Sequence, residues 1–295
     1  MALRRRKPAP ASSGRERTPR REGPGARGGK GPRPPSRPPT APGGEGLYGI
    51  NPVQAALQAR RRVLRQLCLK AGRPSEKLAL LRWLAEQARV PVSEHTQAEL
   101  ESMAGSPNHQ GVVLRCGPLP LLPESKVWET PLGDPPLLLA LDEVEDPRNL
   151  GAVVRCAAAF GAQGVVLTRR HTAPPGAVAS KASAGTLETL PVYEVGNLSQ
   201  FLAQAKERGY WVAGSAVGGG THLPEFQRDR PLVLVLGNEG RGMRELVTRH
   251  CDFLLTIPLA GGGSLNVAAA AAVLLYHLRP KTEPPPPVTG ADESG

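Results

Sequence analysis

Short apolar runs alternate with longer amphipathic segments along the second half of the chain. Residues 137–141, 232–236 and 253–257 are almost wholly apolar, which fits strands that are buried on both faces of a parallel sheet. The same pattern predicts further strands over 164–167 and 211–216, and helices over 149–160, 198–208, 243–250 and 265–278. Strands that alternate with helices in this way are typical of an α/β domain with a parallel sheet, and we expect it to span residues 137–280.

A smaller α/β domain is predicted ahead of this one, over residues 47–116. Its pattern indicates helices over 52–59, 75–88 and 96–103, and strands over 63–69 and 111–115. Asn51 is placed to cap the first of these helices. Residues 117–136 contain six prolines among scattered polar residues, which predicts a semi-stiff linker between the two domains.

Charge is concentrated at the start of the chain. The formal net charge is +11, but residues 1–46 alone carry 12 Lys and Arg against 3 Asp and Glu. With ten prolines and few large apolar side chains, this tail is predicted to be disordered, as are the proline-rich residues 281–295. The basic tail fits a tether to nucleic-acid phosphates or a solubilising segment. A mitochondrial transit peptide is a third interpretation, which prolines such as Pro8 and Pro10 disfavour because they interrupt an amphipathic helix.

Several classes of protein are disfavoured by what the sequence lacks. It has no apolar stretch near the ~20 residues that span a membrane, and no apolar signal-peptide core, so we expect a soluble, intracellular protein. The four cysteines are far apart and form no C-x-x-C pair, which predicts reduced core residues and no metal site; they are Cys68, Cys116, Cys156 and Cys251.

Three polar motifs stand at the ends of apolar runs. They read Asp146-Pro-Arg-Asn-Leu-Gly-Ala-Val-Val-Arg155, Leu236-Gly-Asn-Glu-Gly-Arg-Gly-Met243 and Ile257-Pro-Leu-Ala-Gly-Gly-Gly-Ser-Leu-Asn-Val267. In open α/β sheets ligands bind at the carboxyl ends of the strands, so the motifs predict one binding site. The glycine order G-x-x-G-x-G differs from the usual dinucleotide fingerprint, and no phosphate-loop pattern is present in this domain.

Each candidate side chain also has a simpler interpretation. Glu239 fits a solvated turn carboxylate, Asn149 a helix N-cap, and Ser264 and Asn266 caps of the last helix. Arg155 lies in an otherwise small and apolar helical segment, so we expect it to meet an anion or a subunit boundary.

Taken together, the three motifs resemble those of the SpoU (TrmH-like) RNA ribose 2′-O-methyltransferases of the SPOUT superfamily. Residues 47–278 resemble the subgroup that methylates a guanosine ribose of bacterial large-subunit rRNA, in which the front domain is a ribosomal-protein-like RNA-binding module. The resemblance implies a deep trefoil knot in the methyltransferase domain, an exception to the usual absence of knots. The loop from residue 261 to 264 is one residue shorter than in close relatives, and Ala268 stands where a serine is common.

The resemblance also implies the cofactor and the roles of the site residues. S-adenosyl-L-methionine is expected in the knot, with Gly237, Asn238, Ile257 and Leu265 as its contacts. Asn149, Arg155, Glu239, Ser264 and Asn266 match the family's functional positions. A guanidinium stays protonated, so our hypothesis is that Arg155 stabilises the developing alkoxide, while the proton leaves to a substrate phosphate or water.

The implied function is S-adenosylmethionine-dependent 2′-O-methylation of the ribose of a guanosine in large-subunit rRNA. The resemblance implies a homodimer. The expected location is the cytoplasm or, alternatively, mitochondria. Two other functions stay open on the residues alone: a tRNA ribose methyltransferase of the same family, and a catalytically silent RNA-binding factor in ribosome assembly.

Overall fold

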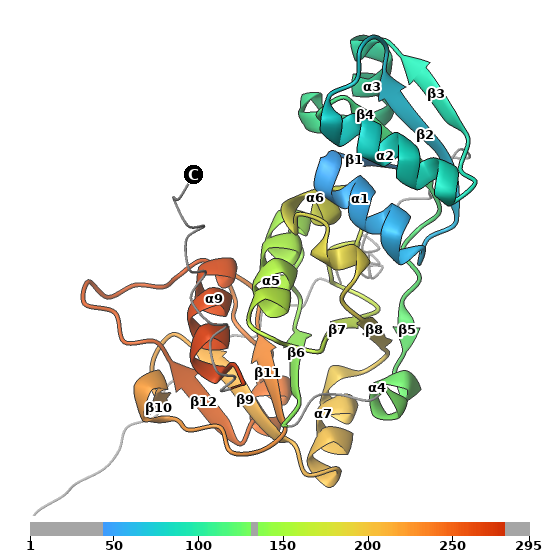
Figure 1. Ribbon diagram of the computed structural model, residues 1–295. Helices are drawn as coiled ribbons and strands as arrows, with labels where there is room; N and C mark the ends of the chain where they lie inside the picture. Colours follow the sequence, from blue (N-terminus) through green and yellow to red (C-terminus); the bar gives the residue numbers. More distant parts are fainter. Residues whose placement is uncertain (1–43, 131–134, 281–295) are drawn as a thin grey trace, which may run out of the picture. The chain divides into compact units, whose positions relative to one another are not determined.

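The computed structural model describes residues 44–130 and 135–280, so the predictions for the tails over 1–43 and 281–295 lie outside the described residues. The front part is built on a four-stranded sheet in the order β1-β4-β2-β3 (Figure 1). Only the β2–β3 pair is parallel. The strands are β1 Glu45–Tyr48, β2 Leu64–Lys70, β3 Val92–His95 and β4 Val112–Cys116. The helices are α1 Ile50–Ala59, α2 Glu76–Gln87, α3 Gln97–Ala104 and the 3-10 turn η1 Pro107–His109.

Capping residues set the limits of two front helices. The Ser75 side chain accepts a hydrogen bond from the N–H of Leu78 and begins α2. Thr96 and Glu99 form a reciprocal capping box that begins α3. Both helices are therefore confirmed to within one residue at each end. The prediction for α1 was wrong at its start: Gly49, with φ 92°, precedes the helix, and Asn51 lies inside it.

The larger sheet has eight strands in the order β10-β12-β9-β11-β6-β7-β8-β5, and every neighbouring pair is parallel. The strands are β5 Leu122–Pro123, β6 Leu137–Leu141, β7 Gly164–Thr168, β8 Val192–Val195, β9 Trp211–Ala216, β10 Thr221–His222, β11 Leu232–Leu236 and β12 Phe253–Thr256. Every residue of β6 and β11 is buried. The predicted parallel α/β domain is confirmed, whereas the trefoil knot stays a prediction.

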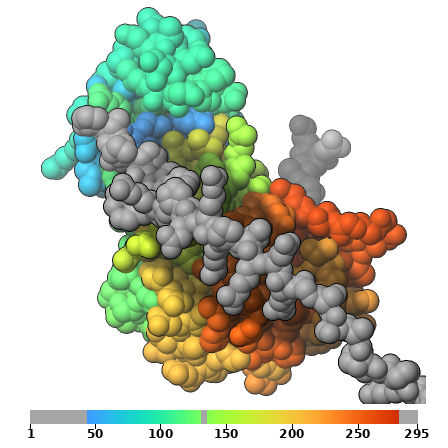
Figure 2. Space-filling view, turned by 180° about the vertical axis from the view of Figure 1, so that it is seen from behind, coloured from blue at the N-terminus to red at the C-terminus, as the bar shows by residue number. Residues whose placement is uncertain are grey.

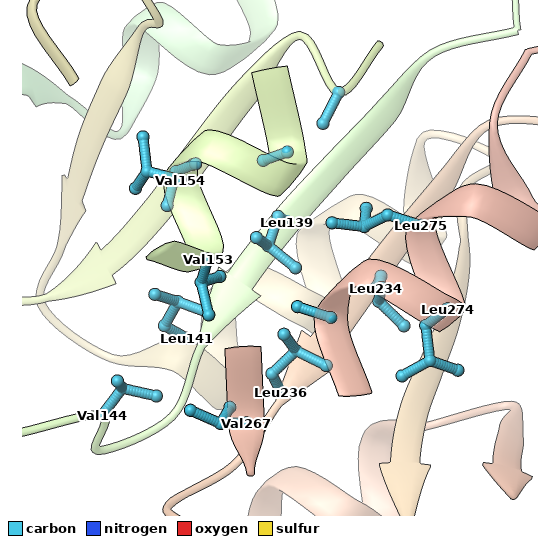
Figure 3. Close-up of a cluster of buried hydrophobic side chains, with 14 of the residues drawn as sticks. Leu139, Leu141, Val144, Val153, Val154, Leu234, Leu236, Val267, Leu274 and Leu275 are labelled. Carbon is cyan, nitrogen blue, oxygen red and sulfur yellow. The ribbon is translucent and has the colours of Figure 1, made fainter. Parts of the chain in front are cut away.

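Helices cover both faces of this sheet. They are α4 Ser125–Glu129, α5 Pro147–Ala159, α6 Ala177–Ala182, α7 Leu198–Glu207, α8 Glu245–His250 and α9 Val267–Leu278, with 3-10 turns η2 Thr186–Glu188 and η3 Leu223–Glu225. Leu139 and Leu141 of β6 pack with Val153 of α5 and Leu274 of α9 on one face (Figure 3). The alternate residue Leu138 packs into a second core on the other face. This two-sided burial explains why the strand is apolar at every position.

Within the predicted linker, residues 117–130 form more regular structure than the linker prediction implied. β5 pairs with β8, and Val127 of α4 is buried. The Trp128 ring stacks on Phe201 at 5.3 Å between centroids. These apolar side chains stand between the prolines and anchor the segment to the sheet. At the other end, Glu45 begins β1 and so belongs to the front sheet rather than to the predicted tail.

Residues 258–266, between β12 and α9, are exposed and project from the larger sheet's helices, in orange to red (Figures 1 and 2). No helix among the described residues is long and apolar enough to cross a membrane.

Candidate active site

Three loops meet at the carboxyl edge of the larger sheet. We call them the Asp142 loop (residues 142–146, after β6), the Gly237 loop (237–244, after β11) and the Ile257 loop (257–266, after β12). β6 and β11 are neighbours whose last residues, Leu141 and Leu236, stand level. The Gly237 and Ile257 loops, with parts of β9 and α9, line a cavity of about 880 Å³. The cavity therefore lies at the edge of the sheet where the sequence predicted a site, and the binding of a ligand there stays a prediction.

Polar side chains from all three motifs form one hydrogen-bonded line. Asn149 Nδ2 donates to Glu239 Oε1 at 2.6 Å, and Asn266 Nδ2 donates to Asn149 Oδ1 at 3.2 Å. The three residues come from α5, the Gly237 loop and the N-terminus of α9. A carboxylate that accepts an amide N–H keeps oxygen lone pairs for a further donor. The line therefore offers an oriented set of acceptors beside the cavity.

The first residues of α5 and α9 show whether Asn149 and Asn266 cap these helices or are available to the site. Asp146, not Asn149, caps α5, because its Oδ1 accepts from the N–H of Arg148 at 2.7 Å. Asn149 is therefore free to serve the site. Asn266 both caps a helix and belongs to the polar line. Its Oδ1 accepts from the N–H of Ala268 at 2.8 Å and caps α9, while its Nδ2 donates to Asn149.

Glycine at position 237 is required by the shape of its loop. A Cβ atom there would lie 2.3 Å from both the carbonyl carbon of Gly242 and the nitrogen of Met243. Asn238 and Gly242 exchange backbone hydrogen bonds of 3.0 and 2.9 Å across the loop. The Gly237 backbone lines the cavity, so a flat ring can approach the main chain with no side chain in between.

Asn238 fixes the conformation of the same loop. Its Oδ1 accepts from the N–H groups of Gly240 and Arg241 at 2.9 and 3.2 Å, and its Nδ2 donates to the Glu143 carbonyl at 2.9 Å. Its side chain is thus engaged within the protein, although the residue lines the cavity.

An ion pair between the buried Asp142 and the exposed Arg244 was missed by the sequence predictions. The Asp142 side chain is fully buried, and its Oδ1 lies 2.6 Å from Arg244 Nη2. Its Oδ2 accepts from the backbone N–H of Arg244 at 2.8 Å. Together these contacts join the Asp142 loop to the Gly237 loop. The signal available in the sequence was the charged residue that directly follows the apolar run of β6.

Five of the predicted site residues are exposed, namely Arg155, Glu239, Ser264, Leu265 and Asn266. Ser264 lines the cavity from the Ile257 loop, as do Ile257 and Leu265. Arg155 does not line the cavity, and within one chain the structure does not bring it to the other predicted residues. It lies on an exposed stripe of α5 with Ala159.

The cavity fits a nucleoside-type cofactor on its own geometry. Its walls are largely apolar, with convergent backbone groups and a few polar side chains, which is the usual construction of a cofactor site. The glycine cradle at Gly237 leaves the space that a side chain would fill. Among the described residues, no three His, Cys, Asp or Glu side chains gather in a way that could hold a metal ion.

The fold and the cavity define an α/β protein with a cofactor pocket at the carboxyl edge of a parallel sheet. Residues 136–276 match the SpoU rRNA Methylase family, and residues 47–122 match the family described as RNA 2′-O ribose methyltransferase substrate binding. The chain belongs to the SpoU rRNA methylase family.

Its relatives include enzymes with assigned reactions. The 23S rRNA (guanosine-2′-O-)-methyltransferase RlmB of Pseudomonas putida is 39% identical over 235 residues, which cover 76% of this chain and 91% of that protein. The human mitochondrial rRNA methyltransferase 1 is 38% identical over 227 residues, which cover 72% of this chain and 64% of that protein.

Among solved structures, the SpoU methyltransferase AviRb of Streptomyces viridochromogenes in complex with the cofactor AdoMet has a TM-score of 0.67 at 25% identity, covering 80% of this chain and 89% of that chain.

Proposed function

We propose that the protein transfers a methyl group from S-adenosylmethionine to the ribose 2′-hydroxyl of a guanosine in large-subunit rRNA. The observation that carries this proposal is the hydrogen-bonded line Asn266–Asn149–Glu239, which joins the three family motifs at the edge of one cofactor-sized cavity. The name of the Pseudomonas putida relative supports the rRNA and guanosine parts of the proposal. The match of residues 47–122 supports the front domain, residues 47–116, as the RNA-binding part.

The backbone of the Gly237 and Ile257 loops would hold the cofactor. Gly237, Ile257 and Leu265 line the cavity, as does Asn238, whose side chain keeps the Gly237 loop in shape. When bound, the cofactor supplies a methyl group that its sulfonium already activates. The remaining work of the protein is to align a ribose hydroxyl and to stabilise the charge that develops on it.

We assign Asn149, Glu239, Asn266 and Ser264 to the alignment of the ribose. The first three form the fixed polar line, and Ser264 adds a hydroxyl from the exposed Ile257 loop. Arg155 is assigned to the developing alkoxide, because its permanent positive charge suits electrostatic stabilisation rather than proton removal. The proton would leave to a substrate phosphate or water.

Arg155 takes this role in a homodimer, in which it reaches the cavity of the partner. Around it, α5 and α9 expose small and apolar side chains at helical spacing, including Ala159, Val273 and Tyr276. An apolar stripe that carries one arginine suits a subunit boundary. The proposed location is the cytoplasm, where rRNA is modified in bacteria; the mitochondrial human relative makes mitochondria the second candidate.

Methyl transfer from labelled S-adenosylmethionine to purified rRNA and tRNA tests the proposal, with the position of ribose methylation mapped. We expect label on the 2′-oxygen of a guanosine in large-subunit rRNA, and none with Arg155→Ala. Label on tRNA alone would show that the substrate is tRNA rather than rRNA. No label on any RNA, from folded protein that binds the cofactor, would favour the assembly-factor function.

A further inference from the structure

A buried arginine joins segments that are far apart in the sequence. Arg62, between α1 and β2, has a fully buried side chain. Its Nε and Nη2 contact the two carboxylate oxygens of Glu188 at 2.7 and 2.9 Å, in a bidentate pair. Its Nη1 donates to Glu45 Oε2 at 2.6 Å. Glu188, in η2, is also almost fully buried. Arg62 belongs to the proposed RNA-binding part, whereas Glu188 belongs to the methyltransferase part.

Arg62 and Glu188 make further hydrogen bonds within the protein. Arg62 donates to the carbonyl oxygens of Gly117 at 3.2 Å and Pro175 at 3.3 Å. Ser180 Oγ donates to Glu188 Oε1 at 2.8 Å. Burial would lower the pKa of Arg62, but the hydrogen bond and charge of Glu188, with the charge of Glu45, raise it overall. The guanidinium is therefore charged inside the protein, in one geometry.

Glycines let the two parts approach each other closely. A Cβ at Gly185, where φ is +92°, would lie 2.8 Å from the carbonyl oxygen of Asn51 in α1. A Cβ at Gly176 would lie 2.4 Å from Glu45 Oε1, which instead accepts from the N–H of Ala177. A larger residue at Gly185 would force the backbones apart, and one at Gly176 would displace the Glu45 carboxylate. The interface is thus shaped at its backbone as well as by the ion pair.

Packed helices connect this contact between the two parts to the candidate active site. α6 starts next to Gly176 and packs against α5, where a Cβ at Gly151 would lie 2.3 Å from the carbonyl oxygen of Ala179. Gly151 is two residues from Asn149. Short, close-packed steps therefore connect the Arg62–Glu188 pair to the first turn of α5.

We propose that Arg62 and Glu188 are positioning residues that hold the RNA-binding part in one orientation toward the cavity, and so determine which ribose of a bound RNA is methylated. A buried ion pair contributes little net stability compared with apolar residues, but it demands one geometry. Fixed separation between an RNA-holding surface and the reacting atoms selects the target by distance. This inference rests on the proposed function.

The test compares the full-length wild type with Arg62→Met/Glu188→Met. The double variant is chosen because Arg62→Met alone leaves the Glu188 carboxylate buried without a cation. The matched control is Arg82→Met/Glu94→Met, which removes an ion pair of 2.7 Å within the front part, where both side chains are exposed. Each protein is assayed on in vitro transcribed large-subunit rRNA and on a short hairpin that contains the wild-type target.

For the double variant we expect the KM for the rRNA to rise at least tenfold and methylation to spread to further riboses. On the hairpin we expect kcat within twofold of the wild type, and the Kd for S-adenosylmethionine should also change less than twofold. The control should match the wild type throughout. An unchanged KM with one methylated ribose would overturn the proposal, as would a parallel loss of cofactor binding, which indicates general damage.

Hydrogen–deuterium exchange separates this proposal from the proposed function. In the double variant, amides in residues 45–62 and 176–190 should exchange at least tenfold faster, while those of β6 and β11 stay protected. Unchanged exchange would show that the pair does not hold the two parts together. If the wild type methylates no RNA, the proposed function fails, whereas the exchange result still reports on the contact itself.

Discussion

Asn149 and Glu239 stand ninety positions apart in the sequence, and Asn149 Nδ2 donates to Glu239 Oε1 at 2.6 Å. Each residue follows a buried strand, β6 or β11, and those strands are parallel neighbours. The pairing of the strands therefore brings the amide and the carboxylate together at one edge of the sheet. This contact fixes the orientation of both side chains before a substrate binds.

Asn149→Ala removes the donor to Glu239 and the acceptor for Asn266. We expect kcat for methyl transfer to fall about 100-fold, the order of loss when one preorganised polar group is removed from an active site. The control is Asn197→Ala, which removes the N-cap of α7 and should cost about 1 kcal/mol of stability without changing kcat. Equal kcat values for the two variants would contradict a role of Asn149 in the site.

Gly237→Ala should abolish tight binding of S-adenosylmethionine. The new Cβ would lie 2.3 Å from two backbone atoms of the same loop, so the loop must move. We expect the Kd, measured by calorimetry, to rise at least about tenfold, the effect of about 1.4 kcal/mol. Gly240→Ala is the matched control in the same loop, because its Cβ would have only Asn238 Oδ1 nearby, at 3.7 Å. If both variants bind equally well, the cradle does not hold the cofactor.

Stability should fall in alkaline solution through one buried thiol, Cys116, and one partly buried thiol, Cys251. Burial raises the pKa of Cys116 to about 12 and that of Cys251 to about 11, from an ordinary value of 9.0. Below about pH 9 both thiols are protonated in the folded and unfolded states, so their contribution is fully present. Above it the unfolded chain loses protons that the folded protein keeps, and stability falls until the pH reaches the folded pKa values.

Urea unfolding between pH 9 and 10.5 measures this effect. For Cys116→Ala, the decline in the free energy of unfolding should be shallower than in the wild type by about 1.4 kcal/mol per pH unit. Cys116→Ala/Cys251→Ala should be shallower still. Parallel pH profiles for all three proteins would show that the thiols do not carry the dependence.

The sequence predicted the elements whose pattern is local. β6, β9 and β11 match their predicted bounds, because an unbroken or alternating apolar run is determined by burial on the sheet. β8 and α6 were not predicted, because the polar Glu194 interrupts the apolar run of β8, and Ser180 and Lys181 interrupt that of α6. Glu45 and Gly46, the first two residues of β1, were assigned to the tail because they follow a stretch rich in proline and glycine.

Contacts between distant residues could not be predicted in the same way. The Asp142–Arg244 pair joins residues 102 positions apart, and the Arg62–Glu188 pair joins residues 126 apart. Neither pair shows a pattern along the chain, since both depend on which strands and turns become neighbours. The motif loops could be located because they follow recognisable strands, whereas Arg155 lies away from the cavity within one chain.

Arg155→Lys tests what the arginine supplies. Lysine keeps the positive charge but presents a single ammonium in place of the planar fork. We expect kcat to fall about tenfold or more, with the Kd for the cofactor unchanged, because the fork fixes the position of the charge at the alkoxide. Arg249→Lys, on the exposed face of α8, should keep the wild-type kcat. Near-normal turnover of Arg155→Lys would show that charge alone suffices.

Mixed dimers of Arg155→Ala and Asn149→Ala test whether the arginine acts across the subunit boundary. If each site combines Arg155 of one copy with Asn149 of the other, a mixed dimer has one site with both mutations and one site with neither. Random exchange of subunits should then restore about a quarter of the wild-type activity, although each parent is inactive, following the symmetry of a two-fold dimer. If both residues act within one copy, every site is damaged and no activity returns.

The reciprocal mixture gives the opposite outcome and serves as the control. Wild type is mixed with Arg155→Ala/Asn149→Ala, so each mixed dimer has one intact chain. In the trans arrangement both of its sites combine one intact and one mutated residue, and the mixed dimer is inactive. In the cis arrangement the intact chain keeps its site, and activity stays in proportion to the wild-type chains present. Restoration in the first mixture together with loss in the second would place Arg155 in the partner's active site, because no arrangement within one chain gives both results.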